Sequence, residues 1–116
     1  MTKGRIVLVP FPFDDMTASK VRPAVCLTNP VGTHRHVVIA FISSQIPVDI
    51  AVTDVVLDPQ QKDFGATGLR VASVLRLHRL VTLTTALIRR DMGKLSPAWQ
   101  EEVNQKLAVL FGLKVS

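Results

Sequence analysis

Short apolar runs, separated by proline, glycine and charged residues, make up most of the chain. The runs are rich in valine and isoleucine and are bounded by turn-forming residues, a pattern typical of β-strands. Turns are expected at residues 28–32 and 65–68, and a polar, exposed loop is expected at residues 14–20. The predicted strands cover residues 4–13, 22–27, 36–44, 53–57, 69–77 and 80–84.

The C-terminal segment has a different period. Ser96 is a favourable N-cap, and Pro97 suits the first position of a helix. The apolar residues that follow recur at helical spacing, and Gly112 is placed to end the element. The pattern therefore predicts one amphipathic helix. Its apolar positions are Trp99, Val103, Leu107, Leu110 and Phe111.

Several short strands followed by one helix predict a mainly β fold with a C-terminal helix, built on a small curled sheet or barrel of about 5–7 strands. With no linker, repeat or change of composition, residues 1–116 are expected to form a single domain. No apolar run approaches the roughly 20 residues of a membrane-spanning helix, and the first run is too brief for a signal peptide. The single cysteine, Cys26, cannot form an internal disulfide, which suits the cytoplasm.

The chain carries a formal net charge of +5 and has an isoelectric point near 10.0. Between residues 62 and 94, seven basic residues stand against two acidic ones. This surplus favours a nucleic acid or an acidic protein as partner, and charge alone leaves both open, together with a merely solvated basic face. The basic residues are Lys62, Arg70, Arg76, Arg79, Arg89, Arg90 and Lys94.

A first candidate for chemistry is Arg22, where the polar loop meets a buried strand. Pro23 biases the preceding residue toward an extended backbone and so restricts its orientation. A fixed guanidinium is planar and always charged, which makes it a natural phosphate ligand. The alternative is that Arg22 forms a salt bridge with Asp14 or Asp15 and completes the loop.

A second candidate is the end of the 36–44 strand. Ser43, Ser44 and Gln45 leave the sheet together and offer two hydroxyls and an amide. Such groups bind phosphate and sugar oxygens of nucleic acids. The alternative is that these serines satisfy the backbone of a turn.

These segments, in this order, resemble the PemK/MazF toxins of type II toxin–antitoxin systems. The resemblance rests on residues 4–11 (GRIVLVPF), 20–27 (KVRPAVCL) and 42–45 (ISSQ), and it continues through residues 68–77 and 93–96. It implies an SH3-like barrel, a homodimer, and metal-independent, sequence-selective cleavage of single-stranded RNA without a cofactor. It also implies a cognate acidic antitoxin as partner, with the toxin–antitoxin complex on operator DNA.

The resemblance places the family's catalytic arginine on Arg22 and its catalytic threonine on Ser43. Serine keeps the hydroxyl but lacks the methyl group that stiffens the threonine rotamer. The implied nucleophile is the 2′-hydroxyl of RNA, so the products carry 2′,3′-cyclic phosphate and 5′-hydroxyl ends and DNA is not cut. Further RNA-binding residues are expected at Lys20, Ser44, Gln45, Arg70 and Arg76.

A second hypothesis keeps the fold but removes the catalysis. The chain would then be a non-catalytic nucleic-acid-binding protein or a topoisomerase poison resembling CcdB. The CcdB-like class relies on its terminal helix, and residues 111–116 show no obvious match to that tail. Arrest of replication with intact transcripts would favour this hypothesis.

Other residues are weaker candidates. His34 and His36 flank Arg35 without a cysteine or carboxylate at ligand spacing, so a solvated basic loop or a phosphate contact is expected rather than zinc. Asp14 and Asp15 are expected to cap the loop rather than bind a metal. Among the aromatic residues that could stack on bases, Phe11 is expected in the core, whereas Phe13 and Phe64 remain open.

Overall fold

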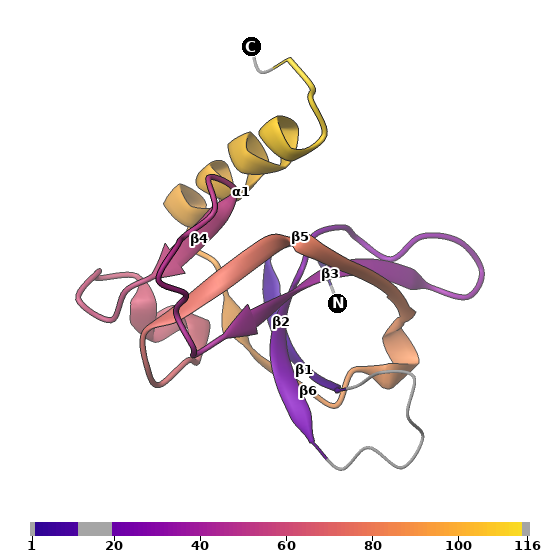
Figure 1. The fold of residues 1–116 in the computed structure, drawn as a ribbon. Coiled ribbons are helices and arrows are strands. Elements are labelled where there is room, and N and C mark those ends of the chain that lie inside the picture. Colours follow the sequence, from indigo (N-terminus) through magenta and orange to yellow (C-terminus); the bar gives the residue numbers. More distant parts are fainter. Residues whose placement is uncertain (1, 12–19, 115–116) are drawn as a thin grey trace.

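The structure is a computed structural model that describes residues 2–11 and 20–114. Within this part, six strands form one sheet, and a single α-helix packs against it (Figure 1). Two 3-10 helices, η1 (Phe64–Thr67) and η2 (Thr85–Leu87), flank β5, and α1 (Pro97–Leu110) follows β6. The strands are β1 (Arg5–Pro10), β2 (Val21–Cys26), β3 (His36–Ser43), β4 (Asp54–Leu57), β5 (Ser73–Thr84) and β6 (Arg90–Lys94).

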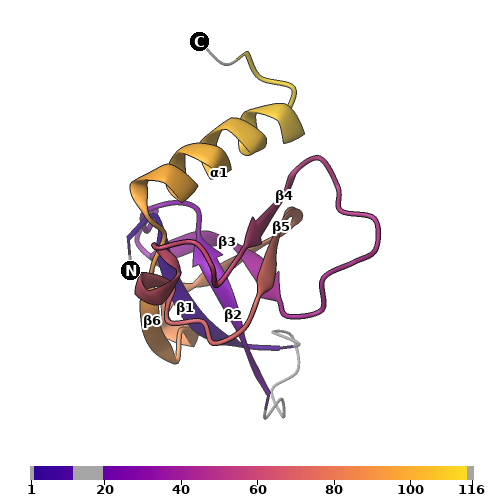
Figure 2. The same ribbon diagram turned by 90° about the vertical axis from the view of Figure 1, so that its left-hand side faces the viewer.

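The strands are ordered β4-β5-β3-β2-β1-β6, and each neighbouring pair is antiparallel. The sheet curls into a half-barrel, with α1 lying across one side (Figures 1 and 2). The predicted mainly β fold with a C-terminal helix is confirmed. Of the predicted loop at residues 14–20, only Lys20 is described.

β5 corrects the prediction of two strands at 69–77 and 80–84. It is one strand of 12 residues that begins at Ser73. The pairing of β5 with β3 shifts register within this strand. Ala40 pairs with Leu80 and Ile42 pairs with Leu75, so a step of two residues on β3 corresponds to a step of five residues on β5. The extra residues bend β5 (Figure 1). The polar residues in this bend interrupt the apolar pattern without ending the strand.

β6 was not predicted. Its sequence, RDMGK, is polar and mostly exposed, and it pairs with β1 alone at the edge of the sheet. An edge strand is held by backbone hydrogen bonds and does not need an apolar side-chain pattern. The first strand is also shorter than predicted: β1 ends at Pro10, whereas the predicted strand reaches residue 13.

Two hydrophobic clusters occupy the two faces of the sheet. The first cluster lies between the sheet and α1 and includes Ile6, Val25, Leu75 and Trp99. The second cluster lies on the opposite face. Neighbouring residues of one strand fall into different clusters because side chains alternate between the faces of a sheet. The second cluster contains Val7, Val9, Ala24, Cys26, Val37, Ile39 and Leu83.

α1 begins and ends as predicted. The Ser96 hydroxyl accepts a hydrogen bond from the backbone N–H of Trp99 at 3.1 Å, and Gly112 adopts a φ of 68° just after the helix. Trp99 and Val103 are buried, but Phe111 is 59% exposed because the C-terminal part of α1 points away from the sheet (Figure 2). None of the helices in the described residues has the length and apolar character needed to span a membrane.

Candidate functional site

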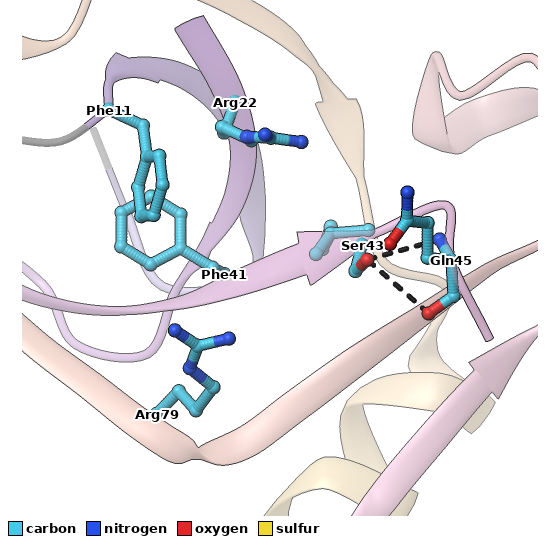
Figure 3. A pocket seen from close by; sticks show the side chains of 7 residues that line it. Phe11, Arg22, Phe41, Ser43, Gln45 and Arg79 are labelled. Atoms are coloured by element: carbon cyan, nitrogen blue, oxygen red, sulfur yellow. Dashed lines mark hydrogen bonds between the residues drawn. The ribbon is translucent and has the colours of Figure 1, made fainter. Parts of the chain in front are cut away.

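A hollow opens where β1, β2, β3 and β5 bring side chains together (Figure 3). Its volume is about 230 Å³, below the range of about 300–1,000 Å³ usual for sites that enclose a drug-sized ligand. The hollow is therefore too small to enclose a drug-sized ligand. The residues that line it are Phe11, Arg22, Phe41, Ile42, Ser43, Gln45 and Arg79.

The lining is an exposed continuation of the second hydrophobic cluster. Residues two apart on a strand share a face, so each strand that contributes to this cluster also aims its next residue toward the hollow. Two lining residues depart from this pattern: Ile42 belongs to the first cluster, and Gln45 lies beyond the end of β3. The residues that alternate on this face, in order from the cluster toward the hollow, are the following: on β1 and just past its end, 7, 9 and 11; on β2, 26, 24 and 22; on β3, 37, 39, 41 and 43; and on β5, 83, 81 and 79.

Arg22 is held at the start of β2, opposite Val9 of β1. Pro23 favours the extended backbone that the strand requires. The guanidinium carbon Cζ lies 5.3 Å from the centroid of the Phe11 ring, within the range of a cation–π interaction. The Phe11 N–H donates to the carbonyl of Lys20 at 3.0 Å, which joins the two strand ends. Arg22 is thus oriented while its side chain stays exposed.

Ser43 is the last residue of β3 and is partly exposed. Its hydroxyl oxygen accepts a hydrogen bond from the backbone N–H of Gln45 at 3.1 Å. The hydroxyl also faces the carbonyl of Gln45 at 3.4 Å, which is longer than the roughly 2.5–3.0 Å usual for an O–H donor. The side chain therefore closes a turn, as the alternative interpretation of these serines expects. Its hydroxyl hydrogen makes only a long contact within the protein and lies at the hollow.

The lining carries two guanidinium groups, from Arg22 and Arg79, and none of its residues is acidic. Arginine remains charged in proteins, so the hollow is positively charged across physiological pH. Within residues 2–11 and 20–114, neither guanidinium forms a salt bridge. Such a site favours an anion, and a phosphodiester matches the paired N–H donors of arginine.

Three of the seven predicted site residues line the hollow. Lys20 and Ser44 adjoin it in the sequence, just before β2 and just after β3, and both are exposed. Arg70 is exposed in the segment that precedes β5 and does not belong to the lining. The three residues in the hollow are Arg22, Ser43 and Gln45.

Arg76 is engaged elsewhere. Its Nε donates to the carboxylate of Asp54 at 3.0 Å, and the Asp54 side chain is 0% exposed. The same carboxylate accepts the backbone N–H of Ala51 at 2.9 Å and lies 3.8 Å from Nδ1 of His78. Arg76 therefore joins β5 to β4 and does not line the hollow.

Four lining residues, Phe11, Phe41, Ile42 and Arg79, were not predicted as part of the site. Phe11 was expected in the core but is half-buried and borders the hollow. Its ring meets Phe41 edge to face, with centroids 5.2 Å apart and an interplanar angle of 77°. Phe41 stands two residues before Ser43, a spacing that points to the same face of the strand. Arg79 is one of the seven basic residues between positions 62 and 94, and the bend that directs it has no signature in the sequence.

The remaining candidates stay outside the hollow. His34 and His36 are exposed, with ring centroids 5.9 Å apart. In the described part of the chain, no three or more His, Cys, Asp or Glu side chains gather as a metal-binding group. Asp14, Asp15 and Phe13 lie outside the described residues.

Two further side chains are buried in the clusters. Cys26 belongs to the second cluster, and its burial raises the pKa of the thiol above the ordinary value. Phe64, left open by the sequence, is buried in the first cluster. Neither side chain faces the hollow.

Comparisons with known proteins identify the family and the fold. The family of PemK-like, MazF-like toxins of type II toxin–antitoxin systems matches residues 2–111. The Mycobacterium tuberculosis toxin MazF-mt6 superposes with a TM-score of 0.73 at 21% identity, over 96% of this chain and 99% of that chain. An endoribonuclease in complex with its cognate antitoxin, from a mycobacterial species, gives 0.71 at 18% identity, over 100% and 97%. The MazE–MazF complex of Deinococcus radiodurans gives 0.71 at 18% identity, over 98% and 97%.

No curated protein sequence matches the chain. At such low identities the solved structures show a shared fold, the curled sheet with its C-terminal helix. The family match, in contrast, extends over nearly the whole sequence, including every strand and the helix. The chain therefore belongs to the PemK-like, MazF-like family of toxins of type II toxin–antitoxin systems.

Proposed function

We propose that this toxin is a metal-independent, sequence-selective endoribonuclease that cleaves single-stranded RNA. The observation that carries the proposal is that Arg22 and Ser43, from different strands, line one positively charged hollow. Two of the similar solved structures are described as endoribonucleases of mycobacterial species, which supports the same activity here.

The chemistry follows from the substrate, because RNA carries its own nucleophile. The 2′-oxygen attacks phosphorus and the bond to the 5′-oxygen breaks, which leaves a 2′,3′-cyclic phosphate and a 5′-hydroxyl. The 2′-hydroxyl loses its proton to solvent, and the departing 5′-oxygen takes a proton from solvent. Negative charge grows on the phosphate, where Arg22 donates two N–H groups and Ser43 donates its hydroxyl. Since arginine stays protonated, Arg22 acts by charge stabilisation rather than as a general base.

The other predicted residues extend this contact along the RNA. Lys20, Ser44 and Gln45 surround the two strand ends and are exposed to bind neighbouring phosphates and sugars. Arg70 attracts the polyanion over a longer range. Arg76 is paired with Asp54, so it adds little net charge to this field.

We propose the same partners that the sequence suggests. The toxin acts in the cytoplasm as a homodimer and is silenced by an acidic antitoxin segment that folds on its basic surface. The complex then binds operator DNA. The net charge of +5 supports an acidic partner, and the Deinococcus relative is a complex of MazE with MazF.

Cleavage of single-stranded RNA in the presence of EDTA tests the activity. Product ends are assayed for the cyclic phosphate and the 5′-hydroxyl, and a DNA of the same sequence serves as the uncut control. Arg22→Ala should lower the rate about 100- to 1,000-fold, the loss seen when one donor to a developing anion is removed. Ser43→Ala should also lower it, whereas Ser43→Thr should keep it. Lys62→Gln, an exposed charge beside the start of α1, should leave the rate unchanged.

Intact RNA under these conditions would contradict the proposal, as would cleavage that survives Arg22→Ala unchanged. Inhibition of topoisomerase supercoiling with intact RNA would instead support the CcdB-like alternative. Affinity for RNA without either effect would identify a non-catalytic binder.

A further inference from the structure

The two ends of the hollow differ in chemistry (Figure 3). Phe11 and Phe41 form an aromatic end, whereas Ser43 and Gln45 form a polar end. Arg79 reaches in from the bend of β5, across the hollow from β2 (Figure 3). A nucleotide has the same division, with an apolar base face beside a charged phosphate and a polar sugar.

We propose that the aromatic end is a base-binding subsite that selects the RNA sequence. In this subsite Phe41 stacks on the base next to the scissile phosphodiester, and Arg79 donates hydrogen bonds to the acceptors of that base. The inference rests on the proposed ribonuclease function and assigns roles to two residues that the reaction itself leaves unused.

Of the two rings that border the hollow, Phe41 is the one without a cation–π contact in the described residues. The Phe11 ring already carries the Arg22 guanidinium, with Cζ 5.3 Å from its centroid. Phe41 packs edge to face with Phe11 and also contacts the second cluster, yet it is only half-buried and borders the hollow. Aromatic side chains in such positions stack on the unpaired bases of single-stranded RNA.

Arg79 is the guanidinium that phosphate binding does not require. A phosphodiester carries one negative charge, which Arg22 matches. Three residues before Arg79, Arg76 has the same charge but is held by Asp54 at 3.0 Å, whereas Arg79 pairs with no carboxylate among the described residues. Arg79 is exposed and lies at the register shift of β5, the kind of irregularity that re-aims a side chain toward a site.

The chemistry of arginine indicates which base is bound. A guanidinium offers donors and no acceptor, so it prefers a base edge with two neighbouring acceptors. Guanine presents O6 and N7 side by side, and arginine is the side chain that most often reads this pair. Adenine places an amino donor beside N7 and is disfavoured. We therefore expect guanine at one of the two positions that flank the cut.

Cleavage kinetics on RNAs that differ only in the bases flanking one scissile bond test the subsite. Arg79→Gln should lower the preference for guanine at one position about 10-fold, because a good arginine–base pair discriminates to that extent. Phe41→Leu should raise KM about 10-fold, with kcat less affected, because stacking contributes to binding. Lys62→Gln removes one exposed charge beside the start of α1, outside the lining of the hollow, and should leave preference and KM unchanged.

Two results would overturn the inference. If Arg79→Gln weakens all RNAs equally and lowers the salt dependence by about one phosphate contact, Arg79 binds the backbone and not a base. An unchanged KM in a folded Phe41→Leu variant would remove the stacking role. Thermal melting shows whether each variant is folded. If Phe41→Leu does not fold, the result with Arg79→Gln alone tests the subsite, because Arg79 is exposed and its replacement should not disturb the fold.

Failure of the ribonuclease proposal is recognised separately. If the wild-type protein leaves every RNA intact, its affinity for single-stranded RNAs with 2′-deoxyribose at the target nucleotide is measured by fluorescence anisotropy. A guanine preference that Arg79→Gln abolishes supports the subsite without catalysis. Equal affinity for all four bases overturns it.

Discussion

Gly93 lies where η1 packs directly on β6, and replacing it with alanine should destabilise the fold. A Cβ at this position would overlap the carbonyl oxygen of Ala66 and would lie 2.7 Å from the carbonyl carbon and oxygen of Thr67. These are backbone atoms, which cannot rotate away as the end of a flexible side chain can. Gly93 also pairs with Ile6 of the buried strand β1, so β6 cannot retreat without disturbing the sheet.

The size of the effect follows from this geometry. Ordinary van der Waals contact for a Cβ begins at 3.4 Å, so even the 2.7 Å contacts require a displacement of about 0.7 Å. Overpacking typically costs about 1–3 kcal/mol. Because the neighbours are backbone, we expect Gly93→Ala to reach the upper end, about 3 kcal/mol. For a domain of this size that loss lowers Tm by about 10 °C.

Thermal and urea denaturation followed by circular dichroism measure this loss. Gly65→Ala is the matched control, because it adds the same methyl group to η1, the 3-10 helix that packs on β6, and no described atom other than those of its chain neighbours and its own helix backbone lies within 4 Å of the new Cβ. We expect the control to unfold within about 0.5 kcal/mol of the wild type or to be slightly more stable. Equal stability of the two variants would refute the close packing of η1 on β6.

Two further predictions concern buried groups. Asp54→Ala leaves Arg76 without its carboxylate. Because the Arg76 side chain is 25% exposed, the free energy of unfolding should fall by about 2–3 kcal/mol, less than for a fully buried pair. Urea denaturation measures this loss, and a value below about 0.5 kcal/mol would mean that the pair contributes little. Burial raises the pKa of the Cys26 thiol, so stability should decline as pH rises above the ordinary cysteine value of about 8.5, where the unfolded chain releases its proton first. A thiol reagent at pH 8 should modify Cys26 only after unfolding, and rapid labelling of the folded protein would contradict its burial.

The fold was largely predictable where side chains determine the pairing. β3 has a long β-branched run, and Ser96 with Pro97 marks the start of α1, so both elements were predicted close to their observed bounds. The failures share a physical cause. β6 is held by backbone bonds at an edge, and the bend of β5 results from register with β3, so neither depends on the local apolar pattern.

The sequence predicted those site residues that lie at strand ends and have a recognisable local pattern. The proline after Arg22 and the polar run at Ser43 are visible in the sequence, and both residues line the hollow. Arg76 and Arg79 look alike in the sequence, three positions apart. Only the tertiary fold separates them, because Asp54 binds one and the bend directs the other into the hollow.

The polarity that hid β6 from the sequence pattern also disfavours the addition of another strand at this edge of the sheet. Each outermost strand of an open sheet exposes unpaired N–H and C=O groups, to which another chain can add. At one border, Arg90, Asp91 and Lys94 place three charges on a strand of five residues. At the other, β4 has only four residues, and Lys106 of α1 donates to the carbonyl of Asp54 at 2.6 Å. The charges of β6 on one side, and a short strand contacted by α1 on the other, disfavour edge-to-edge pairing in a sheet that does not close into a full barrel.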